Sequence, residues 1–119
     1  TRLEVTDSMH ERKTRMVELA DGVIALPGGL GTFEELLEVL TWNQLGLVAM
    51  PVVLLDIERF FSPLFDLLDG AVEAGFVRPA HRELVQSTTR VPDALRRALA
   101  TPPDAVSGGV DKWIDLDRC

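Results

Sequence analysis

The 119-residue chain has no tyrosine, a single cysteine and only two lysines, Lys13 and Lys112. Because Cys119 stands alone, the chain cannot form an internal disulfide or a cysteine-rich metal site, and a reducing cytoplasm is the expected location. No stretch approaches the ~20 consecutive apolar residues of a membrane-spanning helix. Residues 1–15 are too charged for the apolar core of a signal peptide. These absences predict a protein of the cytoplasm that does not cross a membrane.

Basic side chains are outnumbered, since 12 Lys and Arg stand against 19 Asp and Glu, for a net charge of −7. An acidic protein repels nucleic acid and anionic lipid, so we expect neither as a partner. A small anion can still bind, because its site depends on local dipoles and a few placed cations. The hydrophobic fraction of 46% and the charged fraction of 26% are typical of a folded globular domain.

Helical and strand patterns alternate along the chain. Ser8 and Glu11 form a capping box that predicts a helix over residues 8–20. The apolar run at 23–26 lacks alternation, which is typical of a central parallel strand covered on both faces. The remaining predicted elements are a helix at 32–45 capped by Thr32, a strand at 51–55, a helix at 62–74, a strand at 84–87, and a helix opened by Pro92 that ends near residue 100. This order predicts an α/β fold with a Rossmann-like, doubly wound parallel sheet.

The pattern also predicts the domain organisation. Residues 1–100 read as the C-terminal part of a Rossmann-like nucleotide-binding domain, and residues 101–119 as a flexible tail from which Trp113 and Ile114 dock back on the body. A doubly wound nucleotide site lies where two βαβ halves meet, and only one half is visible here. We therefore expect an N-terminal βαβ portion outside these 119 residues.

A glycine-rich loop, residues 27–31, joins a predicted buried strand to a predicted helix. Backbone N–H groups at such a turn point toward a spot where the helix dipole is positive, and glycines let a phosphate come close. Thr32 adds a hydroxyl group at the same place. The alternative is that Gly28, Gly29 and Gly31 only make a tight turn. The strand before the loop and the helix after it favour a phosphate site.

Two basic residues of the first predicted helix, Arg12 and Lys13, are candidates for binding a ligand. Met9, Arg12, Met16 and Leu19 recur at helical spacing, which places Arg12 inside an apolar stripe and Lys13 at its edge. Arg12 either pairs with a phosphate, a ribose or a carboxylate such as Glu35, or extends past the methionines to water. These two readings remain open from periodicity alone.

Glu35 also has two readings. It completes a Thr32-Phe33-Glu34-Glu35 capping box, in which its carboxylate would bond the Thr32 N–H. The same position lies about one turn from a bound phosphate, where a ribose would sit. Glu34 and Glu38 are expected on the solvated side of the helix.

The other polar candidates have modest expected roles. Asp56, just after its strand, is expected to serve a turn. His10 is expected at the surface, and His81 in a structural role. The acidic residues of the second helix have no suitably placed histidine, so we predict no metal site.

Two segments resemble known signatures. Residues 9–13, Met-His-Glu-Arg-Lys, and residues 27–35, Pro-Gly-Gly-Leu-Gly-Thr-Phe-Glu-Glu, resemble the M-H-x-R-K and P-G-G-x-G-T-x-x-E motifs of the LOG ("Lonely Guy") family. The similarity continues to about residue 100. One departure is Ser8, which stands where the family often has aspartate, and both residues cap helices.

The resemblance implies an activity, because LOG proteins are cytokinin riboside 5′-monophosphate phosphoribohydrolases. It implies hydrolysis of the N-glycosidic bond of such nucleotides or of AMP, with release of the base and ribose 5-phosphate and without a cofactor. By the same resemblance Arg12 and Glu35 are the catalytic pair. The residues implied to bind substrate are Met9, Lys13, Gly28, Gly29, Gly31 and Thr32. A homodimer or higher homo-oligomer is implied as well.

Two other functions are compatible with parts of the sequence. A related fold can use the same loop only to bind, as a non-catalytic carrier of a nucleotide or of molybdenum cofactor. The family has also carried a lysine decarboxylase label, but a pyridoxal phosphate enzyme needs a Schiff-base lysine. Lys13 belongs to the first motif and Lys112 to the predicted tail, so this reading is disfavoured.

Overall fold

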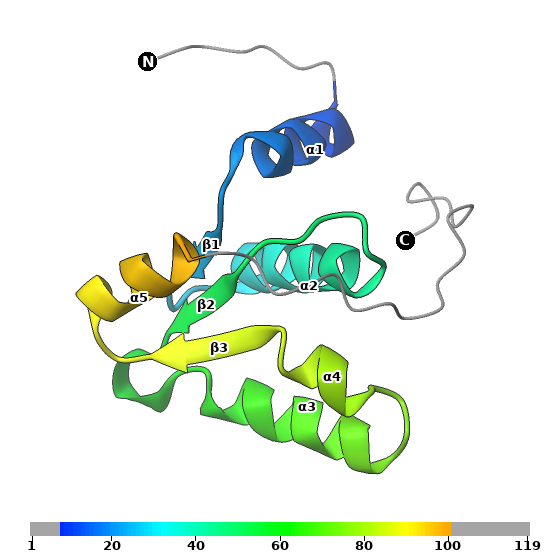
Figure 1. The fold of residues 1–119 in the computed structure, drawn as a ribbon. Coiled ribbons are helices and arrows are strands. Elements are labelled where there is room, and N and C mark those ends of the chain that lie inside the picture. The colour runs from blue at the N-terminus through cyan, green and yellow to red at the C-terminus, as the bar shows by residue number, and fades with distance from the viewer. Residues whose placement is uncertain (1–7, 101–119) are drawn as a thin grey trace.

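The computed structural model describes residues 8–100, apart from the side chains of Met9 and His10. The tail predicted for residues 101–119, including Trp113 and Ile114, lies outside the described residues. In the described part, helices and strands follow one another as α1 (Met9–Leu19), β1 (Val23–Ala25), α2 (Leu30–Gln44), β2 (Val52–Leu55), η1 (Ile57–Arg59), α3 (Ser62–Glu73), α4 (Pro79–Arg82), β3 (Val85–Thr88) and α5 (Val91–Ala98). Figure 1 shows this arrangement.

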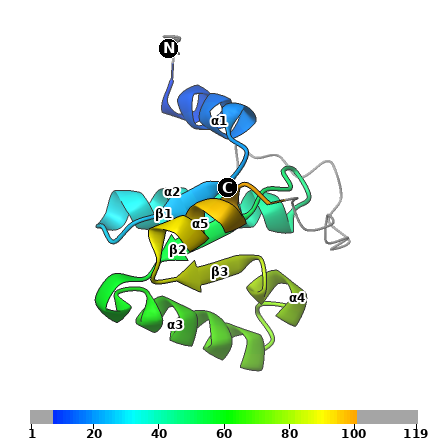
Figure 2. The same cartoon turned by 60° about the vertical axis from the view of Figure 1, so that its left-hand side comes forward.

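The three strands form one parallel sheet in the order β1-β2-β3. All four residues of β2 are buried, and they alternate between two cores. Val52 and Leu54 pack in one core with Leu36 and Val39 of α2. On the opposite face, Val53 and Leu55 pack with α5, which crosses in front of the sheet in Figure 2. The predicted α/β class with a parallel sheet is therefore confirmed.

The prediction that residues 23–26 form a central strand is wrong for the described chain. β1 pairs only with β2 there, and Val23 and Ile24 are half-buried. Its continuous apolar run suits a strand covered on both faces, but one edge of β1 has no neighbouring strand among residues 8–100. The strand at the centre of the described sheet is β2.

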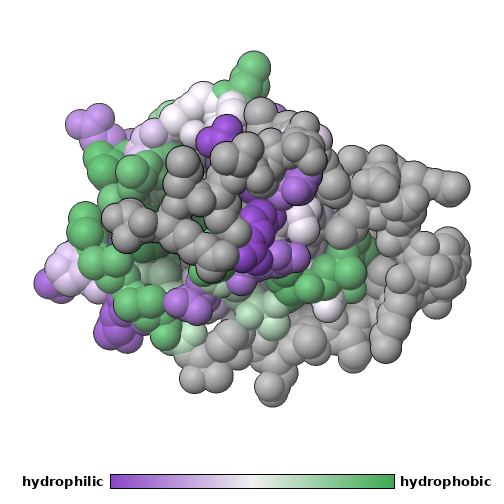
Figure 3. Space-filling view, turned by 90° about the horizontal axis from the view of Figure 1, so that it is seen from above, coloured by the Kyte–Doolittle hydropathy of each residue, from purple (hydrophilic) through white to green (hydrophobic). Residues whose placement is uncertain are grey.

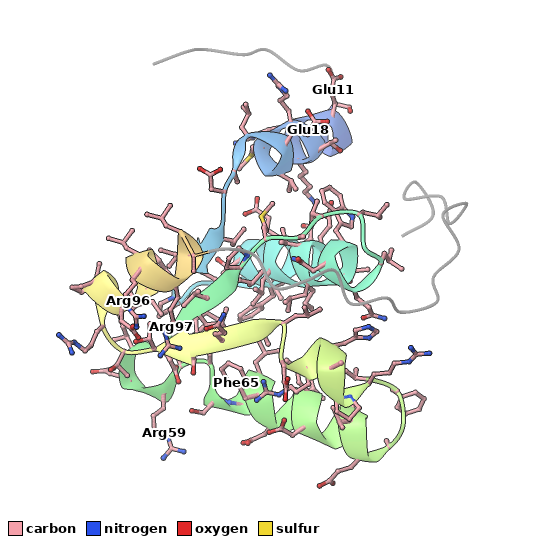
Figure 4. All side chains as sticks on the ribbon, in the orientation of Figure 1. Glu11, Glu18, Arg59, Phe65, Arg96 and Arg97 are labelled. Carbon is pink, nitrogen blue, oxygen red and sulfur yellow. The ribbon has the colours of Figure 1, made fainter. Side chains whose placement is uncertain are left out.

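Local signals place most of the elements correctly. Ser8 caps α1 as predicted, because its Oγ accepts a hydrogen bond from the Glu11 N–H at 3.0 Å. Pro92 lies in the first turn of α5, one position later than predicted. The short segments η1 and α4 were not predicted. Arg82 of α4 contacts α3, with its guanidinium carbon 4.6 Å from the ring centre of Phe65, which is labelled in Figure 4.

A buried asparagine stabilises the end of α2. The Asn43 side chain donates to the Val39 carbonyl at 3.0 Å and accepts from the Met50 N–H at 2.9 Å. The second bond joins α2 to the residue just before β2. Because Met50 is also buried, its N–H depends on Asn43 for a partner.

We expect Asn43→Ala to lower the free energy of unfolding by about 1–3 kcal/mol, the cost of leaving a buried donor without a partner. Urea denaturation monitored by circular dichroism measures this change. Gln44→Ala, at the exposed neighbouring position, is the control and should stay within about 0.5 kcal/mol of the parent protein. Equal stability of the two variants would contradict the role given to Asn43.

Candidate active site

A cavity of about 440 Å³ lies between α1, β1 and α2. Its wall is mostly apolar, and its polar side chains are few: Lys13 from α1, and Thr32, Glu35 and Glu38 from α2. Side chains along α2 from Thr32 to Trp42 line the cavity, so it follows that helix for several turns. The cavity therefore unites residues from both segments that the sequence marked as functional.

The glycine loop lies at the start of α2, but the helix begins earlier than predicted. Gly29 is the N-cap residue, Leu30 is the first helical residue, and the Phe33 N–H donates to the Gly29 carbonyl at 3.2 Å. Thr32 is thus the third helical residue, and the prediction that it caps the helix is wrong. Glycine is accepted at an N-cap, so the helix can start inside the glycine loop.

The three glycines of the loop have different surroundings. A Cβ atom added to Gly28 would overlap the Thr32 hydroxyl, so glycine is needed there for the loop to pack against the helix. A Cβ atom added to Gly29 or Gly31 would meet nothing within 4 Å. The N–H groups of the first helical residues have no acceptor within the helix. Open space beside such donors is what an anion site requires.

Glu35 lies one turn beyond Thr32 on α2 and lines the cavity. Since α2 begins at Leu30, Glu35 is the sixth helical residue, and the capping-box reading of its carboxylate is wrong. Within residues 8–100 no hydrogen bond or ion pair engages this carboxylate. Glu35 is therefore an exposed acidic group that is available to a ligand.

Arg12 does not lie in the buried stripe that periodicity predicted. Arg12 is exposed and is absent from the cavity wall, and Met16 and Leu19 are 52% and 62% exposed. The side of α1 that packs on the core carries Val17, followed by Ala20 just beyond the helix. Lys13, Val17 and Ala20 also recur by four and three residues, a pattern that was passed over in favour of the stripe through Arg12. The structure thus does not bring Arg12 together with Glu35, and it describes no side chain for Met9.

Lys13 is the cation that the structure places in the cavity wall. Its ammonium group forms an ion pair with Glu34, and a second with Glu38 at 3.1 Å. Hydrogen bonds to Glu34 and then to Glu38 raise the pKa of Lys13 above its usual value. The expectation that both glutamates are solvated is wrong for Glu38, whose side chain is 25% exposed, whereas Glu34 is 65% exposed.

Three arginines lie near the ends of β2 and β3 (Figure 4). Arg59 is exposed and follows β2, while Arg96 and Arg97 on α5 both pair with Asp93. Parallel strands end at the same edge of a sheet, so these arginines share an edge with the glycine loop that follows β1. Guanidinium groups therefore lie at the edge where ligands of open α/β sheets bind, and Asp93 pairs with two of them.

The remaining sequence candidates lie outside the cavity wall. The Asp56 carboxylate accepts a hydrogen bond from the Phe61 N–H at 2.8 Å, which confirms its predicted turn role. His81 is buried in α4, and burial, then the charge of Arg78, lower its pKa. Among the described residues, no group of three His, Cys, Asp or Glu side chains is arranged to hold a metal ion. No helix in the described part is long and apolar enough to span a membrane.

Comparison with known proteins identifies the family. Residues 1–98 match the family model described as "Possible lysine decarboxylase". Cytokinin riboside 5′-monophosphate phosphoribohydrolase LOG2 of Arabidopsis thaliana is 48% identical over 89 residues, which are 75% of this chain and 42% of the relative. LOG7 of the same plant, which bears the same enzyme name, is 40% identical over 112 residues, 92% of this chain and 51% of the relative.

A rice protein is similarly close. The probable cytokinin riboside 5′-monophosphate phosphoribohydrolase LOGL2 of Oryza sativa subsp. japonica is 47% identical over 83 residues, 70% of this chain and 34% of the relative. The chain thus spans about half, or less, of the length of the relatives that it matches. The resemblance to the LOG proteins is confirmed. The chain belongs to the family whose model is described as "Possible lysine decarboxylase", and the relatives that it matches are LOG proteins.

Proposed function

We propose that this chain forms the phosphate-binding and catalytic part of a phosphoribohydrolase. The substrate is a cytokinin riboside 5′-monophosphate or AMP, and the products are the free base and ribose 5-phosphate. The observation that carries this proposal is the unengaged carboxylate of Glu35, one helical turn from the glycine loop at the edge of the cavity. The names of the relatives supply the substrate class.

The phosphate binds at the glycine loop. The free N–H groups at the start of α2 and the positive end of its dipole attract a dianion, and the Thr32 hydroxyl adds a donor. Gly29 and Gly31 leave the approach open, whereas Gly28 allows Thr32 to pack against the loop.

The sugar then lies beside Glu35. Cleavage of the N-glycosidic bond builds positive charge on the ribose ring, as in glycoside hydrolysis, and a carboxylate beside the ring stabilises that charge and orients water. The water oxygen bonds C1′, and the departing base takes up a proton. A guanidinium does not serve as a general acid in proteins, so the role we assign to Arg12 is to position the substrate and balance charge. Lys13 lines the cavity, and Met9 is assigned to substrate binding by the motif at residues 9–13 alone.

Lys13 is poorly suited to the decarboxylase activity that the family description names. A Schiff-base lysine must lose its proton, which a lowered pKa favours. Two glutamates instead hold Lys13 in its charged form and raise its pKa. Its ion pairs therefore disfavour Schiff-base formation at Lys13.

A homodimer or higher homo-oligomer, acting in the cytoplasm, completes the proposal. Exposed apolar side chains support it, among them Met16 and Leu26 in the cavity wall and Leu30 at the first position of α2. Figure 3 shows hydrophobic side chains gathered on one side of the upper surface. Contiguous apolar surface of this kind is typical of interaction sites.

The direct test is a chromatographic assay of the full-length protein with a panel of purine nucleoside 5′-monophosphates. We expect free base and ribose 5-phosphate in equal amounts from AMP or from an N6-substituted analogue. Tight AMP binding without base release would instead indicate a carrier. Substrates without the 5′-phosphate should react poorly, since they lack the group that binds the glycine loop.

Gly31→Ala tests the phosphate site separately. A methyl group at this second helical position meets no protein atom within 4 Å, and alanine favours the helix by about 0.5–1 kcal/mol. We therefore expect unchanged or higher thermal stability, together with at least tenfold weaker AMP binding by calorimetry. Gly70→Ala, in equally open space on α3, is the control and should not affect binding. Undiminished AMP affinity in Gly31→Ala would exclude the loop as the phosphate site.

A further inference from the structure

We propose that Glu38, assisted by Glu34, is a positioning residue that clamps Lys13 and so holds the N-terminal half of α1 against α2. The inference rests on the proposed function, because the clamped half of α1 carries Arg12. Glu38 acts through Lys13 and does not touch the reacting atoms. Its effect on catalysis comes from the placement of the helix that bears the basic motif.

The contacts define the clamp. Glu34 and Glu38 are four residues apart, so they project from the same side of α2. Lys13 reaches between them and is bonded to both, and its side chain is only 15% exposed. Glu38 is the more covered of the two acids, at 25% exposure against 65% for Glu34. The hydrogen bond to Glu34 is the larger cause of the raised pKa of Lys13. A covered pair is less screened by solvent than an exposed one, however, and on this ground we assign the larger share of the clamp to Glu38.

The clamp contacts the part of α1 that apolar packing does not secure. Figure 1 shows α1 standing above α2 and joining the body through its C-terminal end. Apolar packing by Val17 and Ala20 secures that end. Lys13 lies one turn before Val17, and Arg12 is its neighbour. Releasing Lys13 would therefore let the Arg12 half of the helix move while the Val17 half stays packed.

The clamp also determines which carboxylates at the cavity are paired. Three carboxylates, those of Glu34, Glu35 and Glu38, lie within about one turn of α2, where like charges repel. The single charge of Lys13 offsets part of the repulsion by pairing with Glu34 and Glu38, and Glu35 is left without an ion pair. The arrangement thus keeps a negative charge available for the sugar at one defined position. The raised pKa of Lys13 means that the clamp persists throughout the neutral pH range.

Glu38→Gln in the full-length protein tests the inference, since it removes the charge and keeps the shape. We expect kcat/KM for AMP to fall between tenfold and a hundredfold, because misplacement of a catalytic element by about 1 Å has effects of this order. Glu34→Gln should have a smaller effect, because Glu34 is more exposed. Glu18→Gln is the matched control: it removes one negative charge from α1 itself, where Glu18 pairs with Arg15. Its kcat/KM should equal that of the parent, and an unchanged kcat/KM in Glu38→Gln would overturn the inference.

A double-mutant cycle separates positioning from a general structural effect. If Glu38 acts through Lys13, then Lys13→Gln combined with Glu38→Gln is no slower than Lys13→Gln alone. Multiplying losses would overturn the inference, because Glu38 would then act independently of Lys13.

Hydrogen exchange gives a readout that does not require activity. In Glu38→Gln, amides before residue 15 of α1 should exchange at least fivefold faster, while those of α2 keep their protection. Equal protection along α1 in parent and variant would overturn the clamp. A parent protein that releases no base would instead overturn the proposed function, and the exchange measurement would still decide the clamp.

Discussion

Glu35→Gln is expected to lower kcat for nucleotide hydrolysis by a hundredfold or more while the protein stays folded. Glutamine keeps the size and polarity of the side chain but removes the negative charge that stabilises the developing charge on the ribose. Loss of one such preorganised electrostatic partner costs about 10²–10³ in kcat. Glu35 has no partner among residues 8–100, so the substitution leaves no group of the described fold unsatisfied.

The measurement combines turnover with stability. Base release from AMP gives kcat, and urea denaturation gives the free energy of unfolding, which should change by less than about 0.5 kcal/mol. AMP affinity should also persist, because the phosphate is bound at the glycine loop and not by Glu35. Glu18→Gln again serves as the charge-matched control. Full turnover in Glu35→Gln would remove this residue from the mechanism.

Gly22→Ala is expected to have the largest effect on stability. Gly22 lies between α1 and β1, where the chain passes the end of α5. A Cβ atom there would overlap the Ala98 carbonyl oxygen and lie 2.9 Å from the carbonyl carbon and 3.1 Å from Cα of the same residue. These are backbone atoms, which cannot rotate away as a side chain can. Accommodating the methyl group requires α5 to shift.

That shift would disturb the core between α5 and the sheet. Ala94 and Ala98 are buried against Val53 and Leu55 of β2. Overpacking of a close contact costs about 1–3 kcal/mol, and we expect the upper end of this range because two elements must separate. Gly70→Ala is the matched control, since it adds the same methyl group in open space within α3 and should stabilise by about 0.5–1 kcal/mol. Thermal denaturation of both variants tests the contrast, and equal midpoints would contradict the role of Gly22.

Much of the fold could be predicted because its signals are local. Ser8 and its capping bond, the buried run of β2, and the proline that opens α5 are each determined by a few neighbouring residues. The short segments η1 and α4 lack such signals. Asn43 was missed because its partner, Met50, becomes its neighbour only when the chain turns between α2 and β2.

The site was harder to predict because its geometry depends on contacts between elements. The residues Thr-x-x-Glu at 32–35 match a capping box. The helix instead begins after Gly29, so Thr32 and Glu35 both lie inside the helix and not at its cap. The apolar stripe through Arg12 was plausible on α1 alone. The orientation of α1 instead depends on the packing of Val17 and Ala20 on the core and on Lys13, whose glutamate partners lie on another helix. Periodicity within α1 fits both sides of the helix and does not choose between them.

The wholly parallel sheet also has a kinetic consequence. Val23 pairs with Val52 and Val52 with Val85, so each strand pair closes a loop of about thirty residues before any ladder forms. No hairpin within the described chain can nucleate the sheet, and its assembly waits until the intervening helices bring the strands together. Slow folding, with unpaired strand edges exposed along the way, is the expected behaviour of such a topology.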